Sequence, residues 1–274
     1  MSDVLAEVDG WAPSTVAVGV TDADATLDAH GPTDAVLPLA SVTKLLTTYT
    51  VLIAARDGLL HLDEPAGPTA SEGATVRHLL AHAGGLPPDP KGPVVEPERR
   101  RIYSNWAFDL LGELVEERVG RPFAEHLDLE VLQPLGMRDT TLDGSPGEAA
   151  HGTVTDLLRF ARELLSPRLL DGALAREATS TAFPGLEGVL PGYGRQTPND
   201  WGLGFEVKGE KAPHWTGEAL SAATFGHFGQ SGSFLWVDPE RGLACAELAD
   251  EPFGEWAMEA WPRFSDGVAT TYGS

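Results

Sequence analysis

The chain has 274 residues with 41 acidic and 19 basic side chains, so its formal charge at pH 7 is −22. An acidic excess of this size repels phosphate backbones and anionic lipid surfaces, so we expect neither nucleic acid nor a membrane as a partner. The single cysteine, Cys245, excludes an intramolecular disulfide.

The N-terminal segment, MSDVLAEVDGW, carries acidic residues where a signal peptide requires basic ones. The longest apolar stretch, near residues 45–55, contains threonines and is shorter than the roughly 20 residues that cross a bilayer. We therefore expect a cytoplasmic protein. We also expect a monomer or weak homo-oligomer that acts on a small-molecule substrate without a cofactor.

The first half of the chain predicts one strand followed by helices. Residues 14–20 (STVAVGV) form a β-rich run, and a helix from about residue 42 to 56 ends at Asp57-Gly58. Each later helix has a polar residue ahead of it and a glycine or proline beyond its end, and these helices cover residues 76–83, 105–119 and about 156–165.

The last third of the chain predicts antiparallel strands. Its short apolar runs are separated by glycine or Asp-Pro turns, and they cover residues 201–207, 224–228, 232–238 and 242–249. A final helix covers roughly residues 255–263. Two segments, 84–98 and 183–200, fit neither a helical nor a strand period, so they are either walls of a functional site or surface excursions.

The stretch LPLASVTKLLTTYTVLIAA (37–55) places Ser41 three residues before Lys44 at the start of a helix. Residues at this spacing lie on one helix face, so the hydroxyl and the amine can share a hydrogen bond. Apolar neighbours lower the pKa of a lysine, which lets it act as a base toward a serine. Alternatively, Ser41 is an ordinary N-cap and Lys44 extends its amine to solvent.

Two further stretches support a catalytic role for this pair. Residues 102–108 (IYSNWAF) contain Tyr103 and Asn105, and residues 226–236 (GHFGQSGSFLW) contain His227-Phe228-Gly229. Together with S-x-x-K, this order resembles the serine β-lactamase and penicillin-binding superfamily, most nearly its class C-like branch with D-alanyl-D-alanine carboxypeptidases and family VIII esterases. Taken alone, Tyr103 is a buried phenol and His227 a core histidine.

The resemblance implies an α+β fold, in which an antiparallel sheet is flanked by helices on both faces beside an all-helical subdomain. The sheet domain would be discontinuous, built from residues 1–60 and 200–274, and residues 61–199 would form the mainly helical subdomain. The catalytic cleft would lie between them.

The resemblance also implies roles for individual residues. Ser41 would be the acylated nucleophile, Lys44 its hydrogen-bonded partner, and Tyr103 a general base in concert with Lys44. Asn105, His227 and Gly229 would position the groups around the nucleophile. The backbone N–H groups of Ser41 and Gln230 would form the oxyanion hole, and the candidates for the substrate pocket are Trp106, Phe228 and Ser231.

The third motif departs from the Lys-Thr-Gly of many relatives, because His227 and Phe228 replace a permanent cation and a hydroxyl. A histidine is mostly neutral at pH 7. We therefore expect turnover to depend on His227 and to favour neutral ester or amide substrates over anionic β-lactams.

Two classes of function stay open. The first is a serine hydrolase that forms an acyl-enzyme on a small ester or amide, with β-lactamase or D-alanyl-D-alanine carboxypeptidase activity as the alternative within this class. The second is a catalytically silent ligand-binding module that keeps the cleft. His78 and His82 have the spacing of metal ligands, but no third ligand is evident, so we expect no metal site.

Overall fold

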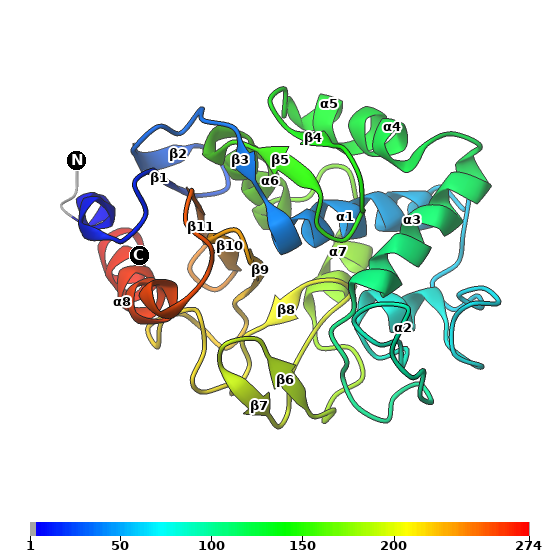
Figure 1. Ribbon diagram of the computed structural model, residues 1–274. Coiled ribbons are helices and arrows are strands. Elements are labelled where there is room, and N and C mark those ends of the chain that lie inside the picture. The colour runs from blue at the N-terminus through cyan, green and yellow to red at the C-terminus, as the bar shows by residue number, and fades with distance from the viewer. Residues whose placement is uncertain (1–3, 274) are drawn as a thin grey trace.

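The computed structural model describes residues 4–273, and its central feature is a six-stranded sheet (Figure 1). All strand pairs in the sheet are antiparallel, and the two ends of the chain meet where the first strand lies against the last. The strand order is β2 (Thr26–His30), β1 (Val16–Thr21), β11 (Leu243–Ala249), β10 (Ser233–Asp238), β9 (Phe225–Gly229) and β8 (Glu206–Val207).

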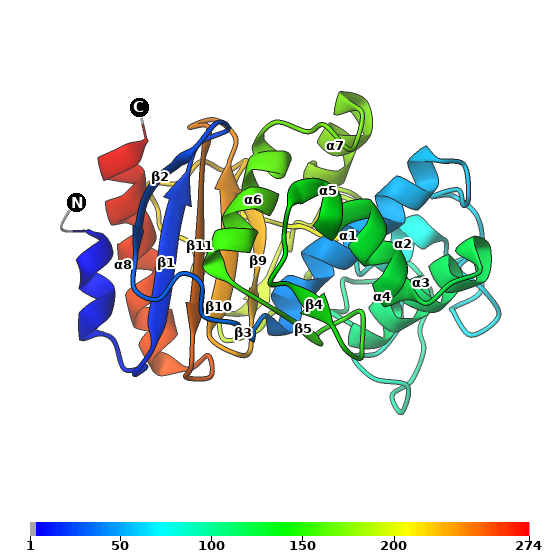
Figure 2. The ribbon, with the colours of Figure 1, turned by 90° about the horizontal axis from the view of Figure 1, so that it is seen from above.

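Helices cover both faces of this sheet, as Figure 2 shows. The helix α8 (Glu255–Tyr272) and the short 3-10 helix η1 (Leu5–Gly10) cover one face, and α6 (Val154–Leu165) covers the other. Successive residues of a strand point to opposite faces, so Cys245 packs toward α8 whereas Ala246 packs toward α6. The predicted fold class is confirmed.

A second, helical region continues from the α6 face of the sheet. It contains α1 (Thr43–Arg56), α2 (Val76–Leu80), α3 (Asn105–Val119), α4 (Phe123–Leu127), η3 (Asp128–Leu132), α5 (Gln133–Leu135) and α7 (Gly172–Thr179). The helix α1 lies at its centre and is buried along most of its length. Two of its threonines donate to backbone oxygens, Thr47 to Pro146 O and Thr50 to Leu46 O, whereas the buried hydroxyl of Thr48 has no partner among residues 4–273.

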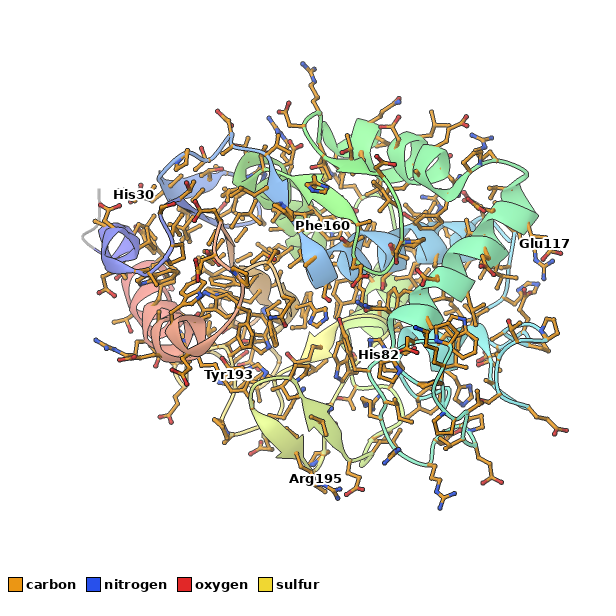
Figure 3. The ribbon with its side chains drawn as sticks, viewed as in Figure 1. His30, His82, Glu117, Phe160, Tyr193 and Arg195 are labelled. Atoms are coloured by element: carbon orange, nitrogen blue, oxygen red, sulfur yellow. The ribbon has the colours of Figure 1, made fainter. Side chains whose placement is uncertain are left out.

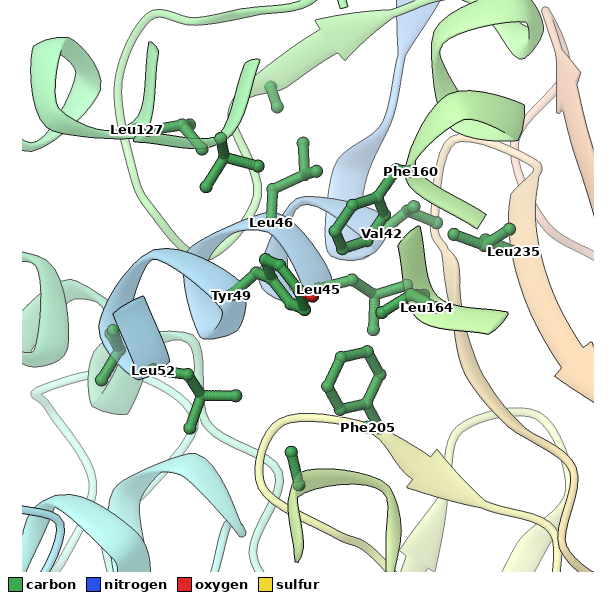
Figure 4. Close-up of a cluster of buried hydrophobic side chains, with 14 of the residues drawn as sticks. Val42, Leu45, Leu46, Tyr49, Leu52, Leu127, Phe160, Leu164, Phe205 and Leu235 are labelled. Atoms are coloured by element: carbon green, nitrogen blue, oxygen red, sulfur yellow. The ribbon is translucent and has the colours of Figure 1, made fainter. Parts of the chain in front are cut away.

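One continuous core joins the sheet and the helical region. Tyr49 of α1 meets the edge of Phe160 of α6, with ring centroids 5.4 Å apart, and Leu235 of β10 belongs to the same cluster (Figure 4). The helix α6 therefore packs on the sheet, although it lies within the segment assigned above to the helical subdomain. The predicted domain boundaries at residues 60 and 200 stay predictions.

Several elements differ in extent from the sequence prediction. Segment 183–200 contains the hairpin β6 (Gly188–Leu190) and β7 (Gly194–Gln196), and only two residues of 201–207 form a strand. The last helix continues through Pro262 to Tyr272, because its apolar side chains, among them Phe264 and Val268, pack on the sheet. A third sheet combines β3 (Leu37–Pro38), β5 (Ala150–Gly152) and β4 (Thr141–Leu142). Within residues 4–273, no helix has the length and apolar character needed to cross a membrane.

Candidate active site

Ser41 lies in a single 3-10 turn, η2 (Ala40–Val42), which leads directly into α1. It makes no side-chain cap, so the N-cap interpretation of this serine does not hold. Ala40, immediately before it, has a φ of 42°, a left-handed conformation that costs a residue with a side chain of order 1–3 kcal/mol. The turn is held by the sheet, since Ser233 Oγ donates to Leu39 O at 2.9 Å.

Lys44 is fully buried and its amine contacts three oxygens. Its Nζ lies 2.6 Å from Asn105 Oδ1, 2.7 Å from Gly147 O and 3.2 Å from Ser41 Oγ. The amine also lies 4.7 Å from the centre of the Tyr103 ring. No carboxylate contacts it in the part of the chain that the structure describes. Burial therefore lowers the pKa of Lys44 to about 7, against opposition from the more distant charge of Glu148.

The contacts of Lys44 suit both of its protonation states. As an ammonium it has three N–H donors for these three oxygens. As a neutral amine it keeps two donors, for Asn105 Oδ1 and Gly147 O, and turns its lone pair to the hydroxyl of Ser41. A proton can pass between Ser41 and Lys44 without any rearrangement of the neighbours.

Tyr103 and His227 extend this arrangement on the other side of Ser41. The Tyr103 hydroxyl donates to Ser41 Oγ at 2.6 Å, and His227 Nε2 lies 3.0 Å from the same phenol oxygen. If His227 Nε2 carries the proton, every bond points the same way, from His227 to Tyr103 to Ser41 to Lys44. Three segments far apart in the sequence thus meet at the Tyr103 hydroxyl.

Burial sets the charge of both rings. It raises the pKa of Tyr103 well above that of a free phenol, although the hydrogen bond to Ser41 opposes the shift. It lowers the pKa of His227 to about 3, and the charge of Lys44 acts in the same direction. Between pH 5 and 9 the site therefore contains a neutral phenol and a neutral imidazole, and Lys44 is the group that titrates.

The Asn105 amide connects Lys44 to a carboxylate that the sequence analysis did not identify. Asn105 Oδ1 accepts from Lys44, and its Nδ2 donates to Glu148 Oε2 at 2.7 Å. Glu148 and Gly147 lie on the loop before β5, about forty residues from Asn105. This loop carries no recognisable spacing, so only the fold reveals its place beside Lys44.

Gly229 lies where β9 passes the turn that carries Ser41. A Cβ at Gly229 would lie 2.5 Å from Leu39 O and 2.4 Å from Ser233 Oγ, so this position accepts only glycine without a shift. The next residue, Gln230, directly follows β9, which packs against the turn that carries Ser41. The backbone N–H groups of Ser41 and Gln230 have no acceptor among residues 4–273.

The three pocket candidates have different surroundings. Phe228 points to the opposite face of the sheet from His227, where its ring lies 4.9 Å from that of Phe253, so the structure does not bring it to Ser41. Ser231 bonds Pro38 O at 2.8 Å and supports the turn. Trp106 is half-buried and packs against the main core at the start of α3.

His78 lies in α2 and His82 just beyond its end, and each forms hydrogen bonds with nearby residues. His78 bonds Thr75 and lies 3.1 Å from Glu98. His82, labelled in Figure 3, accepts from Ser104 N–H through Nδ1, and its ring lies 4.7 Å from that of Tyr103. His82 therefore packs behind Tyr103 and holds the start of α3.

Comparison with known proteins identifies the family. The profile of the Beta-lactamase family matches residues 6–265. The chain belongs to the Beta-lactamase family. Its members include serine hydrolases, and the resemblance predicted from the sequence is confirmed.

Named relatives are similar over different parts of the chain. A crystal structure titled a beta-lactamase from Mycobacterium bovis is 47% identical, with a TM-score of 0.96 over 99% of this chain and 100% of that one. The Escherichia coli D-alanyl-D-alanine-carboxypeptidase/endopeptidase AmpH is 28% identical over 157 residues, 45% of this chain and 41% of that protein. Esterase EstB of Burkholderia gladioli is 32% identical over 149 residues, 39% and 38% of the two chains. The match thus spans about two fifths of the length of these two curated relatives.

Proposed function

We propose that this family member is an acyl-transfer hydrolase in which Ser41 is the nucleophile and Lys44 its base. One observation carries the proposal: Ser41 Oγ lies between Lys44 Nζ at 3.2 Å and the Tyr103 hydroxyl at 2.6 Å. A base with a pKa near 7 is about half neutral at physiological pH, which is the condition for efficient general-base catalysis.

The reaction begins when Ser41 attacks a carbonyl carbon and its proton moves to Lys44. The charge that develops on the carbonyl oxygen is stabilised by the N–H groups of Ser41 and Gln230, which have no other acceptor within the described chain. Each such donor contributes about 2.7–4 kcal/mol to the transition state.

Tyr103 serves as the proton relay to the leaving group. Its raised pKa makes a resting phenolate unfavourable, which supports Lys44 rather than Tyr103 as the group that first accepts the proton. The phenol then donates to the departing oxygen or nitrogen, and the proton held by Lys44 restores the phenol. Water releases the acyl group through the same groups in reverse order.

The absence of a cation at the third motif supports ester or amide substrates that are neutral beside the reacting carbonyl. His227, with a pKa of about 3, carries no charge to hold a carboxylate there. Its role in this proposal is to hold the phenol of Tyr103 in place through the bond at 3.0 Å.

A second candidate is β-lactam hydrolysis. It is favoured by the Mycobacterium bovis structure that is titled a beta-lactamase and is 47% identical to this chain. In this case His227 and the neighbouring backbone would have to hold the carboxylate of the drug without a permanent cation.

The test combines a fluorophosphonate probe with intact-mass measurement, using wild type and Ser41→Ala. We expect wild type alone to gain the mass of the probe and to hydrolyse p-nitrophenyl butyrate. Equal labelling of the two proteins would refute the enzyme and leave the silent binding module. A parallel arm with nitrocefin and a D-alanyl-D-alanine peptide distinguishes the substrate classes, and an activity indifferent to His227→Ala, with preference for nitrocefin, would exclude the role given to His227.

A further inference from the structure

A cavity of about 430 Å³ opens beside Tyr103, between the loop that precedes α3 and the β6–β7 hairpin. Such a volume is in the range of small-molecule sites. We call it the arginine groove, and its lining residues are Pro88, Arg100, Arg101, Ile102, Tyr103, Glu187, Gly188, Val189, Pro191 and Arg195.

The two walls of the groove are joined through the backbone. Arg101 N–H donates to Glu187 O at 2.8 Å, and Arg101 forms a parallel bridge with Gly188. A Cβ at Gly188 would lie 2.9 Å from Arg101 O, so the glycine permits the walls to approach this closely. The groove is therefore formed without a ligand.

Apolar side chains line the middle of the groove. Ile102 and Pro88 lie on one wall, and Val189 and Pro191 on the other. Val189 is 60% exposed, the largest value among the exposed large hydrophobic side chains of the described residues. An apolar chain bound here would cover this surface.

Three arginines line the same groove, and they differ in what they bind. Arg101 is buried, and its guanidinium donates to the backbone oxygens of Ala81, Ala182 and Phe183. Arg100 is exposed and has no hydrogen bond or ion pair within residues 4–273. Arg195, on the hairpin in Figure 3, forms an exposed pair with Glu187 at 3.0 Å. Arg100 and Arg195 are thus available to a ligand, in a chain whose net charge is −22.

We propose that the arginine groove binds a substrate arm with an apolar middle and an anionic end, and that Arg100 and Arg195 recognise the anion. The inference rests on the proposed function, because Tyr103 joins the groove to Ser41. The substrate class is then an ester or amide that is neutral at its reacting end and carries a carboxylate at the far end. Guanidinium groups suit this task because they bind carboxylates through two parallel hydrogen bonds.

The experiment compares esters that differ in charge alone. Mono-p-nitrophenyl adipate and p-nitrophenyl hexanoate carry the anion, or a methyl group, on the acyl arm. The pair 4-carboxyphenyl butyrate and 4-methylphenyl butyrate does so on the leaving group. In one of the two pairs, we expect kcat/KM to be higher for the anionic ester than for its neutral partner. The double variant Arg100→Ala/Arg195→Ala should lower this ratio, anionic over neutral, by roughly tenfold or more.

Matched variants sharpen the readout. Arg99→Ala removes a neighbouring exposed arginine that does not line the groove and should leave the ratio unchanged. Glu187→Gln frees Arg195 from its pair and should raise the ratio, and high salt should lower it. A ratio that the arginine variants do not alter in either pair would overturn the proposal while the hydrolase stands.

A binding measurement separates this proposal from the proposed function. Titration calorimetry with monoethyl adipate uses Ser41→Ala with and without the two arginine substitutions, so it needs no turnover. Binding that is lost with the arginines supports the groove even if Ser41 fails to react with the fluorophosphonate. Equal binding to both proteins, or none to either, would contradict it.

Discussion

Two buried lysines, Lys44 and Lys211, have opposite surroundings. Lys44 Nζ contacts a hydroxyl, an amide oxygen and a backbone oxygen, all of them uncharged. Lys211 Nζ bonds directly to the carboxylate of Glu206, and to Asp200 O at 2.7 Å. Both side chains are at most 5% exposed, so the difference lies in the partner and not in the degree of burial.

The partner decides what each lysine can do. At Lys211, burial lowers the pKa of the amine, and Glu206 opposes this shift. At Glu206, burial disfavours the charge, but His214 and Lys211 outweigh it and lower the pKa of the carboxyl. This pair is a structural ion pair, in which the carboxylate lies directly against the amine. Lys44 has no such partner, so its amine titrates near pH 7 and is available as a base.

Replacing each lysine by methionine gives the largest expected effects, and in different observables. Lys44→Met should lower kcat for p-nitrophenyl butyrate by about 10²- to 10⁴-fold, because the general base is lost. Lys211→Met should lower the free energy of unfolding by roughly 3–5 kcal/mol, because the buried carboxylate of Glu206 loses its ammonium partner. Among residues 4–273 this carboxylate then keeps only His214 and Trp215.

Urea unfolding and steady-state kinetics on the same two variants check this contrast. We expect Lys44→Met to lose less stability than Lys211→Met, since it removes bonds only to neutral oxygens. Retained activity in Lys44→Met, or a larger stability loss there than in Lys211→Met, would contradict the assignment of Lys44 as the catalytic lysine and Lys211 as the structural one.

The pH dependence of stability tests the same lysine in a second observable. Lys44 binds its proton less tightly in the folded state, with a pKa of about 7 against 10.5, so the unfolded chain holds more protons between these values. Its burial cost is therefore complete below pH 7 and is relieved as the pH rises toward 10.5. From pH 6 to pH 9 this residue should contribute a gain of about 2–3 kcal/mol in the free energy of unfolding.

The difference between wild type and Lys44→Met isolates this contribution from the other titrating groups. Urea unfolding of both proteins at pH 6 and pH 9 measures it. Parallel changes in the two proteins would mean that Lys44 is not the desolvated amine that the structure describes.

Gly229→Ala tests how closely the sheet must approach the nucleophile. The new Cβ would meet Leu39 O and Ser233 Oγ, so β9 must move away from the turn that carries Ser41. We expect the rate of fluorophosphonate labelling to fall about 10²- to 10³-fold, because losing an oxyanion donor costs about 2.7–4 kcal/mol. Gly10→Ala, whose Cβ would have nothing within 4 Å, is the control, and equal rates in the two variants would speak against the hole formed with Gln230.

The sequence predicted those features that have a local signal. Short apolar strands bounded by turns, such as β10 and β11, and helices with caps, such as Ser104 and Thr153, lie close to their predicted positions. The extension of α8 beyond Pro262 had no local signal, because packing on the sheet overrides the usual effect of an interior proline. The β6–β7 hairpin was also missed, since its strands have only three residues each and lie in a segment rich in glycine and proline.

The candidate site likewise contains residues that sequence motifs identified and residues that only the fold revealed. The resemblance to family motifs identified the residues that meet at Ser41, and the geometry brings Lys44, Tyr103, Asn105 and His227 together. It also placed Phe228 at the substrate, whereas strand alternation turns that ring to the other face of the sheet. The contacts of Lys44 with Gly147 and the charge of Glu148 depend on a loop without a motif, so only the fold could reveal them.

Glu148 gives the smallest and most specific test of this environment. Its charge raises the pKa of Lys44 without contacting the amine, and burial lowers it more strongly. Glu148→Gln removes the charge and keeps an oxygen that can accept from Asn105, so the pKa of Lys44 should fall by less than about one unit. The acidic limb of the kcat/KM profile should therefore move to lower pH, with the plateau changed little. A limb that moves to higher pH, or one that stays in place while Lys44→Met abolishes it, would show that Asn105 and Glu148 do not set the charge state of this lysine.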